Sequence, residues 1–158
     1  MSQAVFEKII KLLDRRKISY QVFEHEPVFT SQQAAQIRGT KPEQGAKALI
    51  FLGDSRPLMV VLPGSRKVET KIFKQLFAIR NLCLATAEQV EKITNGVRIG
   101  AVPPFGNLFE IPVFVDRSLG VSRQIAFNAG LHTKSIKMKY KDFVRLVNPI
   151  FGEFSELS

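Results

Sequence analysis

The stretch Ala46-Lys47-Ala48-Leu49-Ile50-Phe51-Leu52 is apolar at every position except the lysine. A second apolar run, at residues 58–62, follows a short turn at 53–57 that contains glycine and proline. Each run has the length of a β-strand, and its unbroken apolar character is typical of a strand covered on both faces. The two runs therefore predict a hairpin at the centre of a sheet, which ends at Pro63-Gly64.

Helices and strands are expected to alternate on either side of this hairpin. Apolar periodicity and capping signals predict helices at 2–16, from Thr30 to Gly39, from Thr70 to Phe77, from Thr86 to Asn95-Gly96, and at 140–147. Strands are predicted at 18–22, 82–84, 113–115 and 125–127, with 135–139 along an edge. A chain of 158 residues without repeats or flexible linkers suits one domain. We therefore expect a single domain over residues 1–158, of α/β or α+β class, with a mixed sheet.

The chain is strongly basic, with a formal net charge of +9 at pH 7 and a pI near 9.9. Residues 1–79 carry 13 basic and 7 acidic side chains, and residues 80–158 carry 10 and 7, so the excess is spread along the chain. A single cluster, such as Lys134, Lys137, Lys139 and Lys141, has the spacing of an ordinary solvated face. The overall excess favours a polyanionic partner, nucleic acid or anionic lipid, and in particular phosphate binding.

Several common catalytic motifs are absent from the sequence. There is no Gly-x-Gly-x-x-Gly after a predicted strand and no Gly-x-Ser-x-Gly, and residues 39–47 lack the spacing and the Ser or Thr of a P-loop. The single cysteine, Cys83, lies between leucines and is expected to be buried, and His25 and His132 are expected to be surface imidazoles. We therefore expect no metal and no cofactor, and an enzyme that works by positioning its substrate.

The sequence also predicts a cytoplasmic location without a membrane anchor. No apolar run approaches the roughly 18 residues of a membrane helix, and the N-terminal segment carries Glu7 where a signal peptide is positively charged. One cysteine agrees with a reducing compartment. The apolar face of the helix at 2–16, followed by basic residues, leaves peripheral membrane binding as the least favoured interpretation.

Three local features are candidate site elements. Lys47 interrupts an apolar strand, so its ammonium either reaches a cleft or a bound anion, or extends to solvent from the start of the strand. The segment Gly100-Ala101-Val102-Pro103-Pro104-Phe105-Gly106 predicts a rigid loop, which either presents backbone N–H groups to a ligand or is an ordinary structural turn. Asn128-Ala129-Gly130 predicts a polar turn between two strands.

Taken in order, these segments resemble the YbaK/prolyl-tRNA-synthetase-associated editing domains. The resemblance rests on Phe29-Thr30-Ser31 opening a short helix, Gly45-Ala46-Lys47 opening a central strand, a Gly-x-x-x-Pro loop at 100–104, and the Asn-Ala-Gly turn before an amphipathic strand. Each motif is weak alone, but the ordered set covers nearly the whole chain. The resemblance implies a mixed, mostly antiparallel sheet that is partly closed into a barrel and flanked by helices.

The resemblance also implies an activity: hydrolysis, without a metal, of the ester between a wrong amino acid and tRNA by a free-standing, trans-editing deacylase. It assigns Lys47 to the terminal adenosine and its phosphate as the catalytic residue. It assigns to the aminoacyl group the loop residues Gly100, Ala101, Val102, Pro103 and Pro104. The substrate pocket is expected to be completed by Phe29, Thr30, Asn128 and His132. A water, a hydroxyl of the substrate or the thiol of a cysteinyl group supplies the attack.

A small pocket selects by excluding larger groups, since a single methylene contributes only about 1–3 kcal/mol to discrimination. We therefore expect a small aminoacyl group, alanyl or cysteinyl. The resemblance implies that tRNA for proline carries it, with the 3′ end of tRNA and prolyl-tRNA synthetase as partners. Ala48 follows the lysine where several members of the family have Asn or Asp, and His132 is a candidate for the histidine that one branch uses. These two positions leave the amino-acid specificity open.

A non-catalytic module that binds tRNA or a synthetase explains the basic composition equally well. This alternative predicts saturable binding of tRNA without loss of the ester. Steep salt dependence is expected of both, so it does not separate them.

Overall fold

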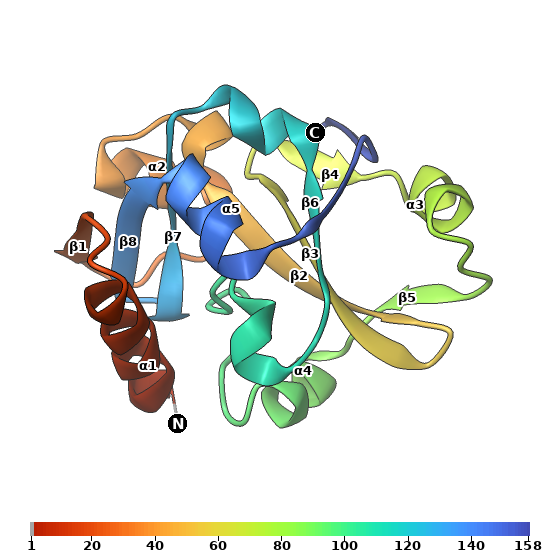
Figure 1. Cartoon of the computed structure of the whole chain (residues 1–158), viewed down its shortest axis with the longest axis horizontal. Coiled ribbons are helices and arrows are strands. Elements are labelled where there is room, and N and C mark those ends of the chain that lie inside the picture. The colour runs from red at the N-terminus through yellow and green to blue at the C-terminus, as the bar shows by residue number, and fades with distance from the viewer. Residues whose placement is uncertain (1) are drawn as a thin grey trace.

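The computed structural model describes residues 2–158 (Figure 1). Its helices are α1 (Ser2–Arg15), α2 (Ser31–Arg38), α3 (Thr70–Leu76), α4 (Ala87–Ile93) and α5 (Tyr140–Val147). Three short 3₁₀ turns are η1 (Pro42–Gln44), η2 (Gly106–Phe109) and η3 (Arg117–Val121). The strands are β1 (Tyr20–Glu24), β2 (Ala46–Gly53), β3 (Arg56–Pro63), β4 (Arg66–Val68), β5 (Leu82–Leu84), β6 (Val113–Asp116), β7 (Gln124–Leu131), β8 (Lys134–Lys139), β9 (Ile150–Gly152) and β10 (Ser155–Leu157).

The predicted central hairpin is confirmed. Strands β2 and β3 pair antiparallel from Ala46–Pro63 to Gly53–Arg56, inside a five-stranded sheet of order β5-β2-β3-β6-β9. The β3–β6 and β6–β9 pairs are parallel, so the sheet is mixed, as expected. Every residue of β3 from Leu58 to Pro63 is buried, because side chains pack on both faces of this strand.

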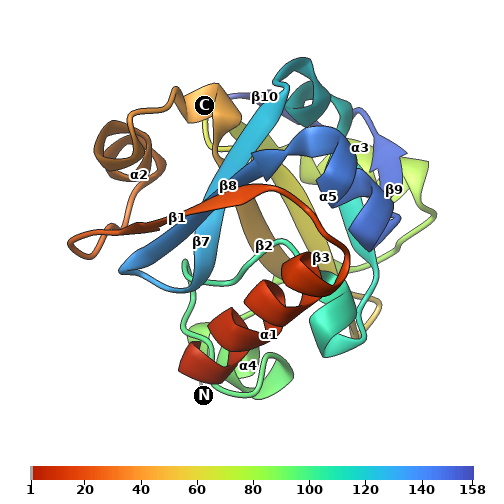
Figure 2. The ribbon, with the colours of Figure 1, turned by 60° about the vertical axis from the view of Figure 1, so that its left-hand side comes forward.

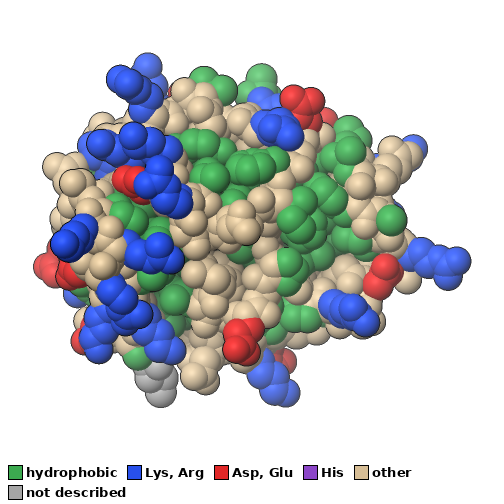
Figure 3. All heavy atoms as spheres, in the orientation of Figure 1, with side chains coloured by type: hydrophobic (Ala, Val, Ile, Leu, Met, Phe, Trp, Pro, Cys, Tyr) green, Lys and Arg blue, Asp and Glu red, His purple; other side chains and the backbone are tan. Residues whose placement is uncertain are grey.

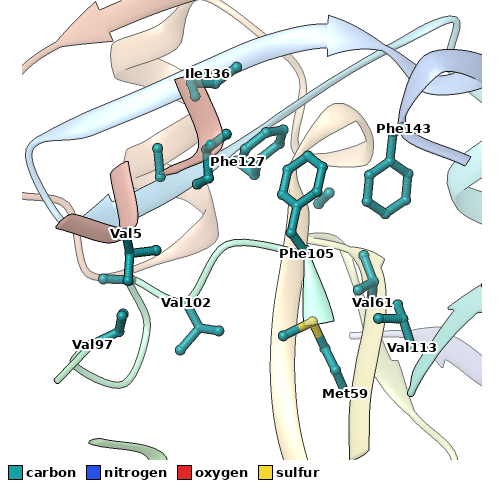
Figure 4. Close-up of a cluster of buried hydrophobic side chains, with 14 of the residues drawn as sticks. Val5, Met59, Val61, Val97, Val102, Phe105, Val113, Phe127, Ile136 and Phe143 are labelled. Atoms are coloured by element: carbon teal, nitrogen blue, oxygen red, sulfur yellow. The ribbon is translucent and has the colours of Figure 1, made fainter. Parts of the chain in front are cut away.

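Two hydrophobic clusters cover the two faces of the hairpin. On one face, Met59 and Val61 of β3 pack with side chains of α1 and α5, which lie on the same side of the hairpin (Figure 2). Phe105 is central there, with its ring edge-on to Phe127 at 5.5 Å and to Phe143 at 5.7 Å (Figure 4). On the other face, the cluster contains Phe51, Leu58, Val60, Leu62, Phe73, Phe114 and Phe154.

The expected closure of the sheet into a barrel is wrong for the described residues. Strands β1, β8 and β7 form a separate antiparallel sheet, and β4 pairs with β10 alone. Strand β7 approaches the start of β2 through one parallel bridge, Gly45–Ala126. One bridge does not make the continuous ladder that barrel closure requires, so the two sheets remain distinct.

Several local predictions are corrected by the structure. Strand β8 lies between β1 and β7 and is not an edge strand. Asn128-Ala129-Gly130 is not a turn but a bulge within β7, where the register shifts and Gly130 takes a φ of +92°. Cys83 is exposed, because β5 is the edge of its sheet.

Most of the remaining element predictions are confirmed. Thr30 caps α2 by accepting from the Gln33 amide, and Gly39 ends the helix with a φ of +69°. Thr86 forms the predicted capping box of α4. Helix α3 differs at its start, where Glu69 is the cap residue in place of Thr70. No helix within residues 2–158 is long and apolar enough to cross a bilayer.

Candidate active site

A pocket of about 190 Å³ opens between α2, the first residues of β2 and the loop that follows α4. Of the ten site residues predicted from the sequence, six line it: Phe29, Thr30, Lys47, Gly100, Val102 and Asn128. The remaining lining residues are Val28, Ser31, Ala34, Arg38, Gly45, Ala46, Ala48, Leu49 and Gly64. Segments far apart in the sequence thus meet in one place, and the lining includes two cations and no carboxylate.

The loop at 100–104 reaches the pocket only through Gly100 and Val102. Ala101 is buried, and its carbonyl accepts a hydrogen bond from the Gly130 amide at 2.9 Å. Pro103 and Pro104 are buried behind the lining. The two prolines therefore hold the loop from the side away from the pocket, and Gly100 and Val102 form its surface toward the pocket.

Gly100 occupies a position that only glycine suits. Its φ is +87°, and a Cβ there would lie 3.2 Å from Nε2 of His132. Its carbonyl accepts a hydrogen bond from Nδ2 of Asn128 at 2.8 Å. The bulge in β7 thus carries Asn128 to the loop and holds the backbone of Gly100 in place.

His132 lies outside this pocket, in an adjoining hollow. That hollow is lined by Pro27, Phe29, Ala87, Glu91, Arg98, Ile99 and His132. Phe29 lines both spaces, is 73% exposed, and has its ring centroid 4.9 Å from that of His132. Burial lowers the pKa of His132, a hydrogen bond to the backbone of Ile99 opposes this, and Arg98 lowers the pKa further. The imidazole is therefore mostly neutral at pH 7.

Lys47 is half-buried at the start of β2, where it pairs with Leu62 of β3. Within the described residues there are two ion pairs, Lys67–Glu156 and Lys134–Glu24, and neither involves Lys47. No hydrogen bond of its ammonium is found there either. Burial lowers the pKa of Lys47, because the charged form is less well solvated at this depth. Of the two alternatives for this lysine, the structure favours a side chain that lines a cleft.

Arg38, at the end of α2, is a second cation of the pocket, and the sequence analysis did not identify it. It is only 8% exposed. Its Nε donates to Oγ of Ser135 at 2.8 Å, and its Nη2 donates to Oδ1 of Asn128 at 2.9 Å. Burial lowers the pKa of Arg38 to about 10, so the guanidinium stays charged at neutral pH.

The hydrogen bonds of Arg38 belong to a hydrogen-bond network that extends across the site. Nδ1 of His25 lies 2.8 Å from the carbonyl of Glu26, and Nε2 lies 2.8 Å from Oγ of Ser135. Oγ of Ser135 accepts from Nε of Arg38, and the tautomer of the imidazole sets which group donates in its contact with Nε2 of His25. The network continues through Asn128 to the carbonyl of Gly100. The expectation that His25 is a free surface imidazole is therefore wrong.

A signal for Arg38 was present in the sequence. Ala34 and Ala35 are the small buried residues of α2, and Arg38 follows Ala34 by four positions, which places it on the same helical face. A basic residue just before Gly39 resembles an ordinary charge in the last turn of a helix, which hides this spacing. Ser135 gave no such signal, because a small polar residue in an amphipathic strand is common.

Comparisons with known proteins agree with this geometry. The model of the aminoacyl-tRNA editing domain family matches residues 25–146. The multifunctional Ser/Thr-tRNA deacylase ProXp-y of Escherichia coli K12 is 29% identical over 157 residues, which cover 94% of this chain and 91% of that protein. The prolyl-tRNA editing protein ProX of Acetoanaerobium sticklandii is 26% identical over 148 residues, 89% of each chain.

A solved structure described as a candidate trans-editing enzyme for prolyl-tRNA synthetase has the same fold, with a TM-score of 0.85 and 23% identity. The superposition covers 96% of this chain and 97% of the chain in that structure. The resemblance found in the sequence is thus confirmed by the family model, by curated relatives and by the fold. The chain belongs to the aminoacyl-tRNA editing domain family, and the two relatives named above are hydrolytic editing enzymes.

Proposed function

We propose that this protein hydrolyses the ester that joins a small amino acid to the terminal adenosine of a mischarged tRNA. The observation that carries the proposal is a pocket of about 190 Å³ that holds the unpaired Lys47 opposite a fixed loop, with no carboxylate in its lining. An acyl ester needs no charged partner, whereas the terminal nucleotide brings a phosphate. A cationic pocket with one immobile backbone wall suits both ends of such a substrate.

Lys47 supplies the charge in this proposal. Its ammonium is partly desolvated and has no competing carboxylate, so a phosphate of the terminal nucleotide gains a charge-assisted hydrogen bond that is stronger than a neutral one. Its position on the central hairpin limits how far its backbone moves, because Lys47 pairs with Leu62 of β3 and Gly45 forms a bridge to Ala126 of β7. The bond therefore fixes the end of the tRNA relative to the loop.

The loop supplies the position of the ester. The backbone of Gly100 is held by Asn128, and Val102 closes the wall beside it. A water held there attacks the ester carbonyl carbon, the bond to the ribose oxygen breaks, and that oxygen takes the proton. The products are the free amino acid and tRNA. Placing water and carbonyl about 3 Å apart contributes several kcal/mol to the rate enhancement without a protein nucleophile.

The size of the pocket restricts the amino acid to a small one. Alanine and cysteine on tRNA for proline are the substrates expected from the sequence, and serine and threonine, named for the Escherichia coli relative, belong to the same size class. Larger side chains meet Val28, Phe29 and Val102, three of the apolar residues that line the space. We propose discrimination against bulk, which a pocket achieves better than discrimination against a missing methylene.

The test is ester hydrolysis with tRNA for proline that carries alanine, cysteine, serine, threonine or proline. Wild type, Lys47→Ala and the control Lys71→Ala are compared, since Lys71 is exposed on α3 and outside the pocket. We expect wild type and the control to release at least one small amino acid rapidly, and Lys47→Ala to be slow. If every ester survives while the tRNA is bound, the non-catalytic binding module becomes the better description.

A further inference from the structure

A second, larger hollow lies on the other side of η1 from the pocket. It has a volume of about 990 Å³ and is lined by Lys41, Glu43, Gln44, Gly120, Val121, Ser122, Arg123, Gln124, Lys139, Tyr140 and Lys141. We propose that this basic groove binds the sugar-phosphate backbone of the acceptor stem of tRNA. The inference rests on the proposed function, because it takes the terminal adenosine to lie in the pocket beside Lys47.

The groove has the charge that a phosphate backbone requires. Four cationic side chains line it, from Lys41, Arg123, Lys139 and Lys141, against one carboxylate, from Glu43. All four cations are exposed, and neither of the two ion pairs within the described residues involves them. Figure 3 shows Lys and Arg side chains gathered on the left of that view, over α1, β1, β8 and the start of α5. These cations are free to exchange small counter-ions for phosphates.

The place of the groove fits the length of a tRNA end. Gln44 lines the groove, and Gly45, the next residue, lines the pocket. On β7, Gln124 lines the groove and Asn128 lines the pocket, a separation of roughly 13 Å along a strand. That is the length of about four stacked nucleotides. A single strand that ends in the pocket therefore brings the first base pairs of the stem to the groove.

The wall of the groove is preformed. The amide of Tyr140 donates to the carbonyl of Arg123 at 2.9 Å, which joins the start of α5 to the start of β7. The ring of Tyr140 packs so closely on Gly120 that a Cβ there would meet its atoms at 3.0–3.1 Å. The lysines thus extend from a fixed frame. Exposed cations on a wall held by these contacts suit repeated phosphates and read no base sequence.

The experiment uses the double variant Lys139→Gln/Lys141→Gln. The matched control is Lys8→Gln/Lys11→Gln, which removes the same charge from exposed positions of α1, a helix that contributes no residue to the lining of the groove. Each protein is assayed on full-length mischarged tRNA and on a short charged trinucleotide that has the same 3′ end but no stem. Binding of uncharged tRNA is measured in parallel over a range of salt concentrations.

We expect the groove variant to lose on the order of tenfold in kcat/KM on full-length tRNA, through KM, and nothing on the trinucleotide. The slope of log Kd against log salt should fall by about one for each lysine removed, and the α1 control should match wild type. An equal loss on both substrates, or unchanged binding of uncharged tRNA, overturns the inference. If wild type hydrolyses no ester, the binding slopes still test the groove, so its failure is distinct from failure of the proposed function.

Discussion

The two cations of the pocket, Lys47 and Arg38, differ in what holds them. Arg38 is almost fully buried and donates two hydrogen bonds to side chains of β7 and β8. Lys47 is half-buried, and its ammonium makes no such bond within the described residues. The arginine is therefore part of the frame that shapes the site. The lysine keeps its bonding capacity for a ligand.

The two cations of the pocket therefore have different roles: Arg38 holds the structure of the site, and Lys47 is available to bind a ligand. A buried guanidinium is costly unless it has hydrogen-bond acceptors, and here neutral oxygens accept from its Nε and Nη2 in place of a carboxylate. The pocket thus keeps a net positive charge when empty. A bound anion relieves the repulsion between the two cations, which adds to its affinity.

The largest effect is expected on activity from Lys47→Met. Methionine keeps much of the apolar stem and removes the charge, so the substrate loses its strongest contact. We expect kcat/KM for the mischarged tRNA to fall by about 10²–10³, the loss typical of removing one key donor to developing or bound charge. The melting temperature should stay the same or rise slightly, because a partly desolvated ammonium is removed.

The control for this variant is Lys71→Met, an exposed lysine of α3. It should leave both activity and melting temperature unchanged. A marked loss of stability in Lys47→Met, comparable to its loss of activity, contradicts the assignment of this lysine to ligand binding alone.

The second effect is expected on stability from Arg38→Met. Asn128 then loses the donor at its Oδ1, and Ser135 loses one of its partners. Leaving such groups unpaired in the interior costs about 2–3 kcal/mol, or roughly 4–12 °C in Tm for a chain of this size. Activity should fall as well, because Asn128 no longer holds the loop firmly.

Thermal unfolding of Arg38→Met is compared with that of Arg145→Met, an exposed arginine of α5 whose removal should change Tm little. Arg38→Lys should be intermediate, since one ammonium cannot reproduce the two directed bonds of a guanidinium. Full activity and full stability in Arg38→Met exclude a role for this residue in shaping the site.

The third effect tests the link between the frame and the loop through Asn128→Asp. The carboxylate still accepts from Arg38, and more strongly, but it has no N–H to donate to the carbonyl of Gly100. We expect stability close to wild type and activity lower by about tenfold, the effect of one lost neutral hydrogen bond. Asn128→Ala, which loses both bonds, should reduce stability and activity together, so equal melting points for the two variants argue against the link.

The sequence alone predicted the parts of this molecule whose signals are local. The hairpin of β2 and β3 follows from two apolar runs, and the ends of α2 follow from Thr30 and Gly39. Lys47 was identifiable because a charge within an apolar strand is costly. These features depend on a few neighbouring residues. The hairpin and the ends of α2 are confirmed in the structure, and Lys47 lines the pocket.

The features that were missed depend on contacts between distant residues. Arg38 and Ser135 are 97 positions apart, and nothing in either neighbourhood indicates their hydrogen bond. The barrel was inferred by analogy, whereas the pairing of β7 with the start of β2 stops after one bridge. Pro103 and Pro104 belong to a motif of the site, yet packing buries them behind it. Tertiary pairing therefore decides which residues of a motif meet the ligand.

The smallest effect is a pH dependence that separates the two cations within one protein. Burial lowers the pKa of Lys47 below the ordinary lysine value, so over the window between these values the folded protein has released a proton that the unfolded chain retains. The free energy of unfolding of wild type, relative to Lys47→Met, should therefore rise with pH through that window, while ligand binding by the ammonium is lost. The measurement compares the two proteins by denaturant unfolding and by binding of uncharged tRNA, at pH values below about 10, where Arg38 begins to titrate. The comparison cancels groups common to both, such as Tyr140, whose pKa is raised by burial. If the relative stability and the affinity for tRNA both rise or both fall with pH, the assignment of the Lys47 charge to ligand binding is contradicted.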